Sequence, residues 1–246
     1  MIRKRKLFFP RRIPEPKAME DVEMEVFEKL SFQNYKRWMI PFVDEAVQYA
    51  DLNSGKVLDV GCGPGLLTRE FALRSKNMQI VCIDTSLKAL EIAKENCKKL
   101  NNVQFLTGDA TQLPFSDKSF DLVVCKDSFH HFADAKRAFR EMLRILKRNG
   151  VLYIQDMRRD LPMYLLRRSM PPDTILKKLQ FYSTRAAYTK QEVKNILREL
   201  RINHFLIKTR KLTDTLRNKY EKQGIDVKQL KEGFQARYVL IVKQTK

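Results

Sequence analysis

The fold of this 246-residue chain is decided by the stretch Val57-Leu58-Asp59-Val60-Gly61-Cys62-Gly63-Pro64-Gly65. Its first half places the strand formers Val57, Leu58 and Val60 around one carboxylate. Its second half has three glycines within five residues, which lets a ligand approach the backbone closely. Because Leu66 to Ala72 continues with apolar residues at helical spacing, the stretch predicts a buried strand, a ligand-binding turn and a helix.

The chemistry of this turn narrows the choice of ligand. A glycine turn between a strand and a helix often binds a diphosphate at the helix N-terminus. Here the spacing is GxGxG rather than GxGxxG, and Asp59 stands two residues before the first glycine. A carboxylate at that position repels a diphosphate, but it suits a ligand that carries an ammonium and a sulfonium.

Strands and helices alternate after the turn. Further strands are predicted at 79–84, 103–106, 120–125 and 151–154, with helices at 87–97 and 135–146 between them. The segments 204–208 and 238–242 are predicted as a final antiparallel pair. This alternation predicts an α/β fold: a Rossmann-like, doubly wound, seven-stranded sheet, mostly parallel with an antiparallel last strand and with helices on both faces.

The string from Asp59 to Gly65 resembles motif I of the class I S-adenosylmethionine (SAM) methyltransferases, and further motifs of that family follow in order. The resemblance covers residues 55–157 as a methyltransferase-11-like core of the UbiE/MenG type. It implies a SAM-dependent methyltransferase, with SAM as cofactor and S-adenosylhomocysteine (SAH) as product.

The resemblance also assigns the cofactor contacts to the strand ends, where open α/β sheets bind ligands. Asp84 would accept hydrogen bonds from the ribose hydroxyls, and Asp109 with the Ala110 amide would contact the adenine. Asp109 could instead be a simple turn residue after Gly108. The predicted cofactor-binding residues are Asp59, Gly61, Cys62, Gly63, Gly65, Asp84, Thr85, Asp109, Ala110 and Lys126.

The catalytic candidates follow the fourth strand, in the loop that faces the methyl group in the family. They are Asp127, His130 and His131. A neutral histidine is a suitable general base near pH 7, although either histidine could be purely structural. Methyl transfer from a sulfonium gains much of its acceleration from positioning and from exclusion of water, so an essential base is not required.

Positive charge dominates the composition, with 48 Lys and Arg against 29 Asp and Glu. The net charge of +19 predicts an acidic partner or substrate, or else a solvated basic surface. Arg158, Arg159 and Asp156 follow the fifth strand at the ligand edge and are predicted to bind the acceptor. Arginine pairs with carboxylates and phosphates, so an anionic small molecule is expected. The basic arm from Met1 to Arg12 is expected to be mobile.

The chain is predicted to divide into an N-terminal extension, 1–50, and a methyltransferase domain, 51–246, with an inserted cap at 158–188. The aromatic segment 32–49 would either lie over a pocket or pack on the core. The charged segment 210–234 is expected at the surface.

The cysteine pattern argues against a metal site, and the short apolar runs argue against a membrane span or a secretory signal. Cys62, Cys82, Cys97 and Cys125 form no CxxC pair and have no histidine at ligand spacing, so no metal site is predicted. Free thiols in strands fit a reducing compartment, and a cytoplasmic location is expected. Apolar runs are too short for a membrane span, and the first twelve residues lack the apolar core of a secretory signal.

Three functions remain open: a small-molecule methyltransferase, an RNA methyltransferase and a SAM-binding protein without catalysis. The charge suggests RNA. The stretch Cys125-Lys126-Asp127-Ser128 argues against it, because it lacks both the [DNS]PP[YFW] string of amino-methylating enzymes and the proline that precedes the cysteine of cytosine-C5 enzymes. The sequence names neither the acceptor nor an oligomeric state.

Overall fold

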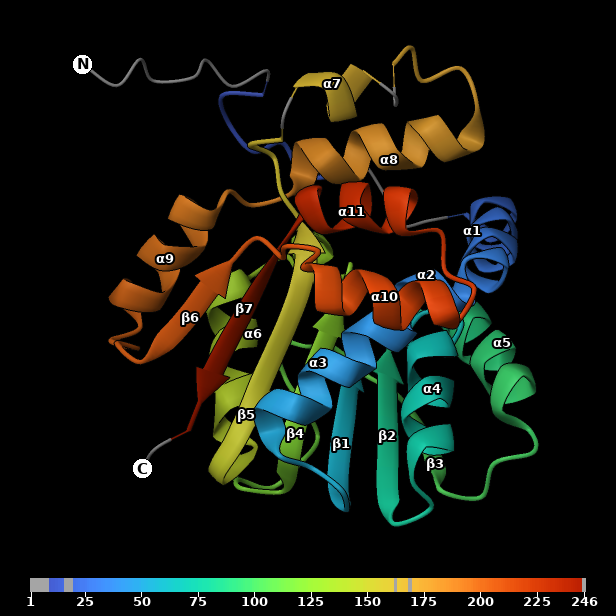
Figure 1. The fold of residues 1–246 in the computed structure, drawn as a ribbon. Coiled ribbons are helices and arrows are strands. Elements are labelled where there is room, and N and C mark those ends of the chain that lie inside the picture. The colour runs from blue at the N-terminus through green and yellow to red at the C-terminus, as the bar shows by residue number, and fades with distance from the viewer. Residues whose placement is uncertain (1–8, 16–19, 162, 168–169, 245–246) are drawn as a thin grey trace.

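The computed structural model describes residues 9–15, 20–161, 163–167 and 170–244. Seven strands form one sheet in the order β3-β2-β1-β4-β5-β7-β6 (Figure 1). The strands are β1 (Gly55–Val60), β2 (Met78–Asp84), β3 (Val103–Thr107), β4 (Phe120–Lys126), β5 (Leu146–Met157), β6 (Phe205–Lys208) and β7 (Arg237–Lys243). β7 pairs antiparallel with both β5 and β6, and the pairs among β1 to β5 are parallel. The predicted fold class is confirmed.

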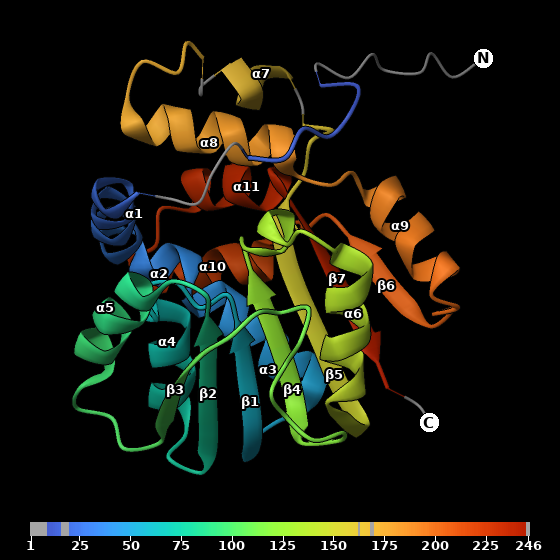
Figure 2. The same cartoon turned by 180° about the vertical axis from the view of Figure 1, so that it is seen from behind.

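Helices cover both faces of the sheet, as Figures 1 and 2 show from opposite sides. They are α3 (Ile40–Ala50), α4 (Leu66–Arg74), α5 (Leu87–Cys97), α6 (Ala135–Arg144) and α9 (Lys190–Glu199). Val57 packs with α3 and α4, whereas its neighbour Leu58 packs with α6 and α9 on the opposite face. Both side chains are buried, so β1 is apolar at successive positions, as a parallel strand covered on both sides requires.

A cap lies beyond the carboxyl ends of the parallel strands, with α8 above α11 in both views (Figures 1 and 2). Its helices are α1 (Asp21–Gln33), α2 (Tyr35–Trp38), α7 (Met163–Leu166), α8 (Ile175–Ala186), α10 (Asp214–Lys222) and α11 (Val227–Gln235). The expectation that 210–234 is only surface was wrong. Tyr220, Leu230 and Phe234 are buried together, because one apolar face of α10 and α11 packs inward.

In the N-terminal segment, the structure decides between the two alternatives for the aromatic residues and corrects the expectation of a mobile arm. α3 packs on the sheet, with the Phe42 ring 4.9 Å from the Tyr153 ring, so most of the aromatic segment belongs to the core. Residues 1–8 of the basic arm lie outside the described residues, but Phe9 is buried against the Phe181 ring at 5.3 Å. The arm is therefore anchored to α8 from residue 9 onward. Within the described part of the chain, no helix is long and apolar enough to cross a membrane.

Candidate functional site

A cavity of about 1380 Å³ lies between the strand ends and the cap. Sites for one small ligand usually measure about 300–1,000 Å³, so this cavity has room for a cofactor and a second molecule. It has two parts, which come from different elements. The part formed by the loops after β1, β2, β3 and β4 is called the cofactor half, and the part formed by α1, α7, α8 and α11 is called the acceptor half, after the ligands that the sequence predicts for them.

The glycine turn after β1 presents its backbone to the cofactor half. Gly61 N donates to Ile83 O at 2.8 Å, which ties the turn to β2. Gly63 has a φ of +52°, and a Cβ at this position would meet no atom within 4 Å, so its backbone faces open space. Gly65 has a φ of +72°, and a Cβ there would lie 2.6 Å from Ala93 Cβ, so only glycine lets α4 begin this close to α5.

Two acids flank this turn. Asp84 accepts hydrogen bonds from Gly63 N at 2.8 Å and Ser86 N at 2.9 Å, which fixes its carboxylate at the end of β2. Asp59 is 1 % exposed and accepts a hydrogen bond from Thr68 Oγ1 at 2.7 Å. Burial raises the pKa of Asp59 to about 7, because a charged carboxylate is poorly solvated there.

The remaining predicted cofactor residues also line the cavity: Cys62, Thr85, Asp109, Ala110 and Lys126. Asp109 Oδ1 accepts a hydrogen bond from Thr111 N at 2.7 Å, so the turn role is present along with the cavity position. Gly65 does not line the cavity. The structure brings these residues together, and their contacts with SAM remain predictions.

The Asp127 carboxylate forms ion pairs with two cations of the protein. Lys126 Nζ lies 2.6 Å from Asp127 Oδ2, and Arg237 Nε lies 2.6 Å from Oδ1. Burial alone would raise the pKa of Asp127, but the two cations outweigh it and hold that pKa well below its usual range. A carboxylate held in this way is a poor general base, which argues against the predicted catalytic role of Asp127. Arg237, at the start of β7, was missed by sequence reasoning.

His130 is held by Asp156. The Asp156 carboxylate accepts hydrogen bonds from His130 N at 2.8 Å and Met157 N at 2.7 Å, and it contacts His130 Nδ1 at 2.7 Å. Asp156 is fully buried and does not line the cavity, so its predicted role in acceptor binding is replaced by one of orienting His130. Burial opposes the charged form of His130, but Asp156 outweighs it, and the pKa of His130 is raised.

Arg158 and Arg159 do not reach the cavity, in contrast to the prediction. Arg158 pairs with Asp160 at 2.8 Å and donates to Thr209 Oγ1 at 3.0 Å. Arg159 is 3 % exposed and pairs with Glu192. Both guanidinium groups are satisfied within the protein, and they stabilise the connections around the end of β5.

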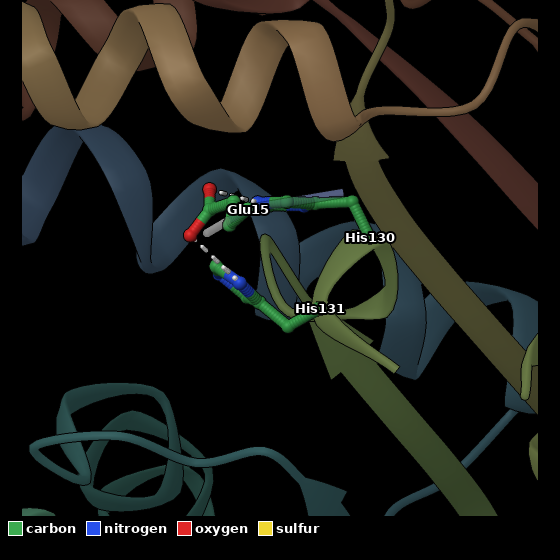
Figure 3. A group of neighbouring side chains, drawn as sticks. All are labelled: Glu15, His130 and His131. Carbon is green, nitrogen blue, oxygen red and sulfur yellow. Dashed lines mark ion pairs between the residues drawn. The ribbon is translucent and has the colours of Figure 1, made fainter. Parts of the chain in front are cut away.

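The N-terminal segment supplies two cavity residues that the sequence did not indicate. Arg12 donates to Ala186 O and to His130 O, both at 2.6 Å. Glu15 lies 3.2 Å from His131 Nδ1 (Figure 3). No local pattern predicts these contacts, because their partners lie more than 100 residues away in the sequence.

The acceptor half is mainly apolar. Its lining includes Met24, Phe27, Leu30, Leu161, Leu165, Leu176 and Leu179. Five cations among the described residues also line the cavity. Arg12 binds carbonyl oxygens, Lys126 and Arg237 pair with Asp127, and Arg37 donates to the side chains of Asn34 and Gln229. Lys228 of α11 is the fifth. The apolar lining from α1, α7 and α8 therefore favours an acceptor with an apolar body.

Comparisons with known proteins match part of the chain to a methyltransferase domain and to named methyltransferases. Residues 58–154 match the family model described as a methyltransferase domain. Over 128 residues the chain is 37 % identical to a demethylmenaquinone methyltransferase of Thermotoga maritima, covering 52 % of this chain and 53 % of that protein. Over 108 residues it is 33 % identical to a malonyl-[acyl-carrier protein] O-methyltransferase of Legionella pneumophila, covering 44 % and 38 %. The chain thus spans about half the length, or less, of these relatives.

Among solved structures, one from Methanococcus maripaludis, described as that of a SAM-dependent methyltransferase, has a TM-score of 0.70 at 23 % identity. The match covers 96 % of this chain and 98 % of that one, and at this identity it shows the fold. The fold is Rossmann-like, and residues 58–154 match a methyltransferase domain. In both respects the chain resembles the class I SAM-dependent methyltransferases.

Proposed function

We propose that this protein transfers the methyl group of SAM to a small molecule with an apolar body. The observation that carries this proposal is that one cavity is lined by acids and backbone groups at the strand ends and by apolar side chains of α1, α7 and α8 under the cap. The name of one relative, demethylmenaquinone methyltransferase, agrees with an acceptor of this kind.

In the proposed complex, SAM lies along the strand ends. Asp84 accepts hydrogen bonds from the ribose, and Asp109 with the Ala110 amide contacts the adenine. The methionyl end lies by Asp59 and Gly61, where a carboxylate meets the ammonium of the ligand. This arrangement directs the sulfonium methyl toward the acceptor half.

Methyl transfer is an in-line displacement: the acceptor atom attacks the methyl carbon, and the C–S bond breaks with its electron pair left on sulfur. The cap contributes by positioning the acceptor and excluding water. Where the acceptor atom carries a proton, His130 is the polar group at hand. Its segment η1 (Phe129–His131) follows β4 and packs against α8, and so reaches both halves of the cavity.

Calorimetry followed by a turnover assay tests the proposal. SAM is expected to bind with micromolar affinity, about −8 kcal/mol. Release of SAH should then follow with hydroquinones that carry apolar tails, but not with small carboxylates or total RNA. Salt-sensitive RNA methylation would favour an RNA methyltransferase, and SAM binding without any turnover would favour a non-catalytic role.

A pair of matched variants separates the two halves. Leu179→Asp places a charge in the acceptor half and should lower turnover by at least about tenfold, with SAM affinity changed less than about twofold. Leu206→Asp, at a leucine that is 44 % exposed on β6, should change neither. Equal losses of SAM affinity and turnover in Leu179→Asp would contradict the proposed division.

A further inference from the structure

Three side chains from distant parts of the sequence point toward one another at the edge of the cavity (Figure 3). They are Glu15, which precedes α1, and the adjacent His130 and His131 of η1. Glu15 Oε2 lies 3.2 Å from His131 Nδ1, and Glu15 Oε1 lies 3.8 Å from His130 Nε2. Ser183 Oγ of α8 donates to Glu15 Oε1 at 2.7 Å and helps to fix the carboxylate.

His130 Nε2 is a buried polar atom without a hydrogen-bond partner among the described residues. The side chain of His130 is 1 % exposed, and its other ring nitrogen is occupied by Asp156 at 2.7 Å. A buried polar atom left unpaired is costly, so one that faces a cavity indicates a ligand. A carboxylate behind a histidine is also the arrangement that orients metal-binding histidines in proteins.

The spacing and the charge of the cluster suit a metal ion. One ligand atom from each of the three residues can be chosen so that all lie within 4.8 Å of one another. Bonds of about 2.0–2.2 Å to a tetrahedral Zn²⁺ place ligand atoms about 3.4 Å apart, which small side-chain rotations can reach. Two neutral histidines with Glu15 and the supporting Asp156 carry two negative charges, which match a divalent cation.

We propose that Glu15, His130 and His131 bind a first-row divalent metal ion of the Zn²⁺ type, with its open coordination positions facing the acceptor half of the cavity. Two imidazoles and one carboxylate form a set that favours Zn²⁺ over Mg²⁺, because Mg²⁺ prefers oxygen ligands. Three protein ligands leave a position for an exogenous group, as in catalytic rather than structural zinc sites. The metal site is built from residues that do not hold SAM.

The catalytic use of the metal rests on the proposed function. An acceptor hydroxyl or thiol at the open position would lose its proton to solvent, because the cation stabilises the resulting anion. That anion attacks the methyl carbon of SAM, the C–S bond breaks, and the products are the methylated acceptor and the neutral thioether SAH. In the metal-loaded protein, His130 then acts as a ligand rather than as a base.

Titration of the full chain with Zn²⁺ after treatment with a chelator tests the site. Calorimetry should show one Zn²⁺ per chain, and Co²⁺ should give visible absorption bands of a protein-bound ion. Mg²⁺ should not compete at equal concentration. Glu15→Gln and His131→Gln should each weaken Zn²⁺ binding at least tenfold, and Asp156→Asn about 10- to 100-fold. His204→Gln is the matched control, because His204 is exposed and lies outside the cavity.

SAM binding, measured on the same samples, separates this proposal from the proposed function. Retained SAM binding in the Glu15 and His131 variants would show that the fold is intact. No Zn²⁺ binding by wild type, or Zn²⁺ binding that Glu15→Gln and His131→Gln leave unchanged, would overturn the metal site and leave the proposed function standing. Zn²⁺ binding without SAM binding would support the metal site and overturn the proposed function.

Discussion

The two halves of the cavity are built in opposite ways. The cofactor half consists of short loops that each follow a strand, and its contacts are largely backbone amides and carboxylates such as Asp84. The acceptor half is assembled from α1, α7, α8 and α11 and closed by the segment at Arg12 and Glu15. The sheet register fixes the first half, whereas the second depends on tertiary contacts between segments far apart in the sequence. Substitutions in the first should therefore affect stability and SAM affinity, and those in the second should affect the acceptor.

The largest effect is expected from Gly65→Ala. The alanine would adopt a φ of +72° and place its Cβ 2.6 Å from Ala93 Cβ. We expect the free energy of unfolding to fall by about 3–4 kcal/mol in urea titrations. Gly224→Ala is the matched control, because its φ is +71° and a Cβ there meets nothing within 4 Å, so it should cost only about 1–2 kcal/mol. Equal losses in both variants would show that close packing of α4 on α5 contributes nothing.

A smaller effect is expected from Asp84→Ala in the cofactor half. Loss of the carboxylate should weaken SAM binding by about 1.5–3 kcal/mol, roughly 10- to 150-fold, because hydrogen bonds to a charged group are lost. Calorimetry of Asp117→Ala gives the control, since that acid is 69 % exposed and lies outside the cavity. An unchanged dissociation constant for SAM in Asp84→Ala would show that Asp84 does not bind the ribose.

The pH dependence of SAM affinity should report on Asp59. Its pKa of about 7 means that the free protein holds this carboxyl protonated below pH 7. An ammonium placed beside it favours the ionised form, so binding must release the proton, and the affinity should fall as the pH falls below 7. The expected change is at most about tenfold per pH unit, levelling off above pH 7. Asp59→Asn should remove this slope, and a slope that persists in the variant would assign it to another group.

The smallest effect on the site is expected from Arg158→Ala. Its guanidinium pairs with Asp160 outside the cavity, so SAM affinity and turnover should change less than about twofold. Stability should fall by about 1.5–3 kcal/mol, because mostly buried hydrogen bonds to a charged group are lost. Arg12→Gln is the informative counterpart, because Arg12 binds the His130 carbonyl. It should lower turnover on the order of tenfold or more through misplacement of η1. A large loss of turnover in Arg158→Ala would restore the anionic-acceptor hypothesis.

Sequence reasoning succeeded where one local pattern determines the structure. The glycine string after β1 and the acids at strand ends predicted the sheet and the residues that line the cofactor half. It failed where contacts are long-range. Arg158 follows a strand on the ligand edge, but the nearby Asp160 binds its side chain. Glu15 joins His130 only because the N-terminal segment crosses the cap, and α11 lines the cavity although its sequence is that of a charged surface helix.

A crystal structure of the protein with SAH tests the central claim most directly. The account predicts the ribose at Asp84, the adenine at Asp109 and Ala110, and the methionyl group by Asp59 and Gly61, with the sulfur facing an unfilled apolar space beneath α8. SAH bound elsewhere, or SAH that fills the space lined by Leu176 and Leu179, would contradict the division of the cavity into a cofactor half and an acceptor half.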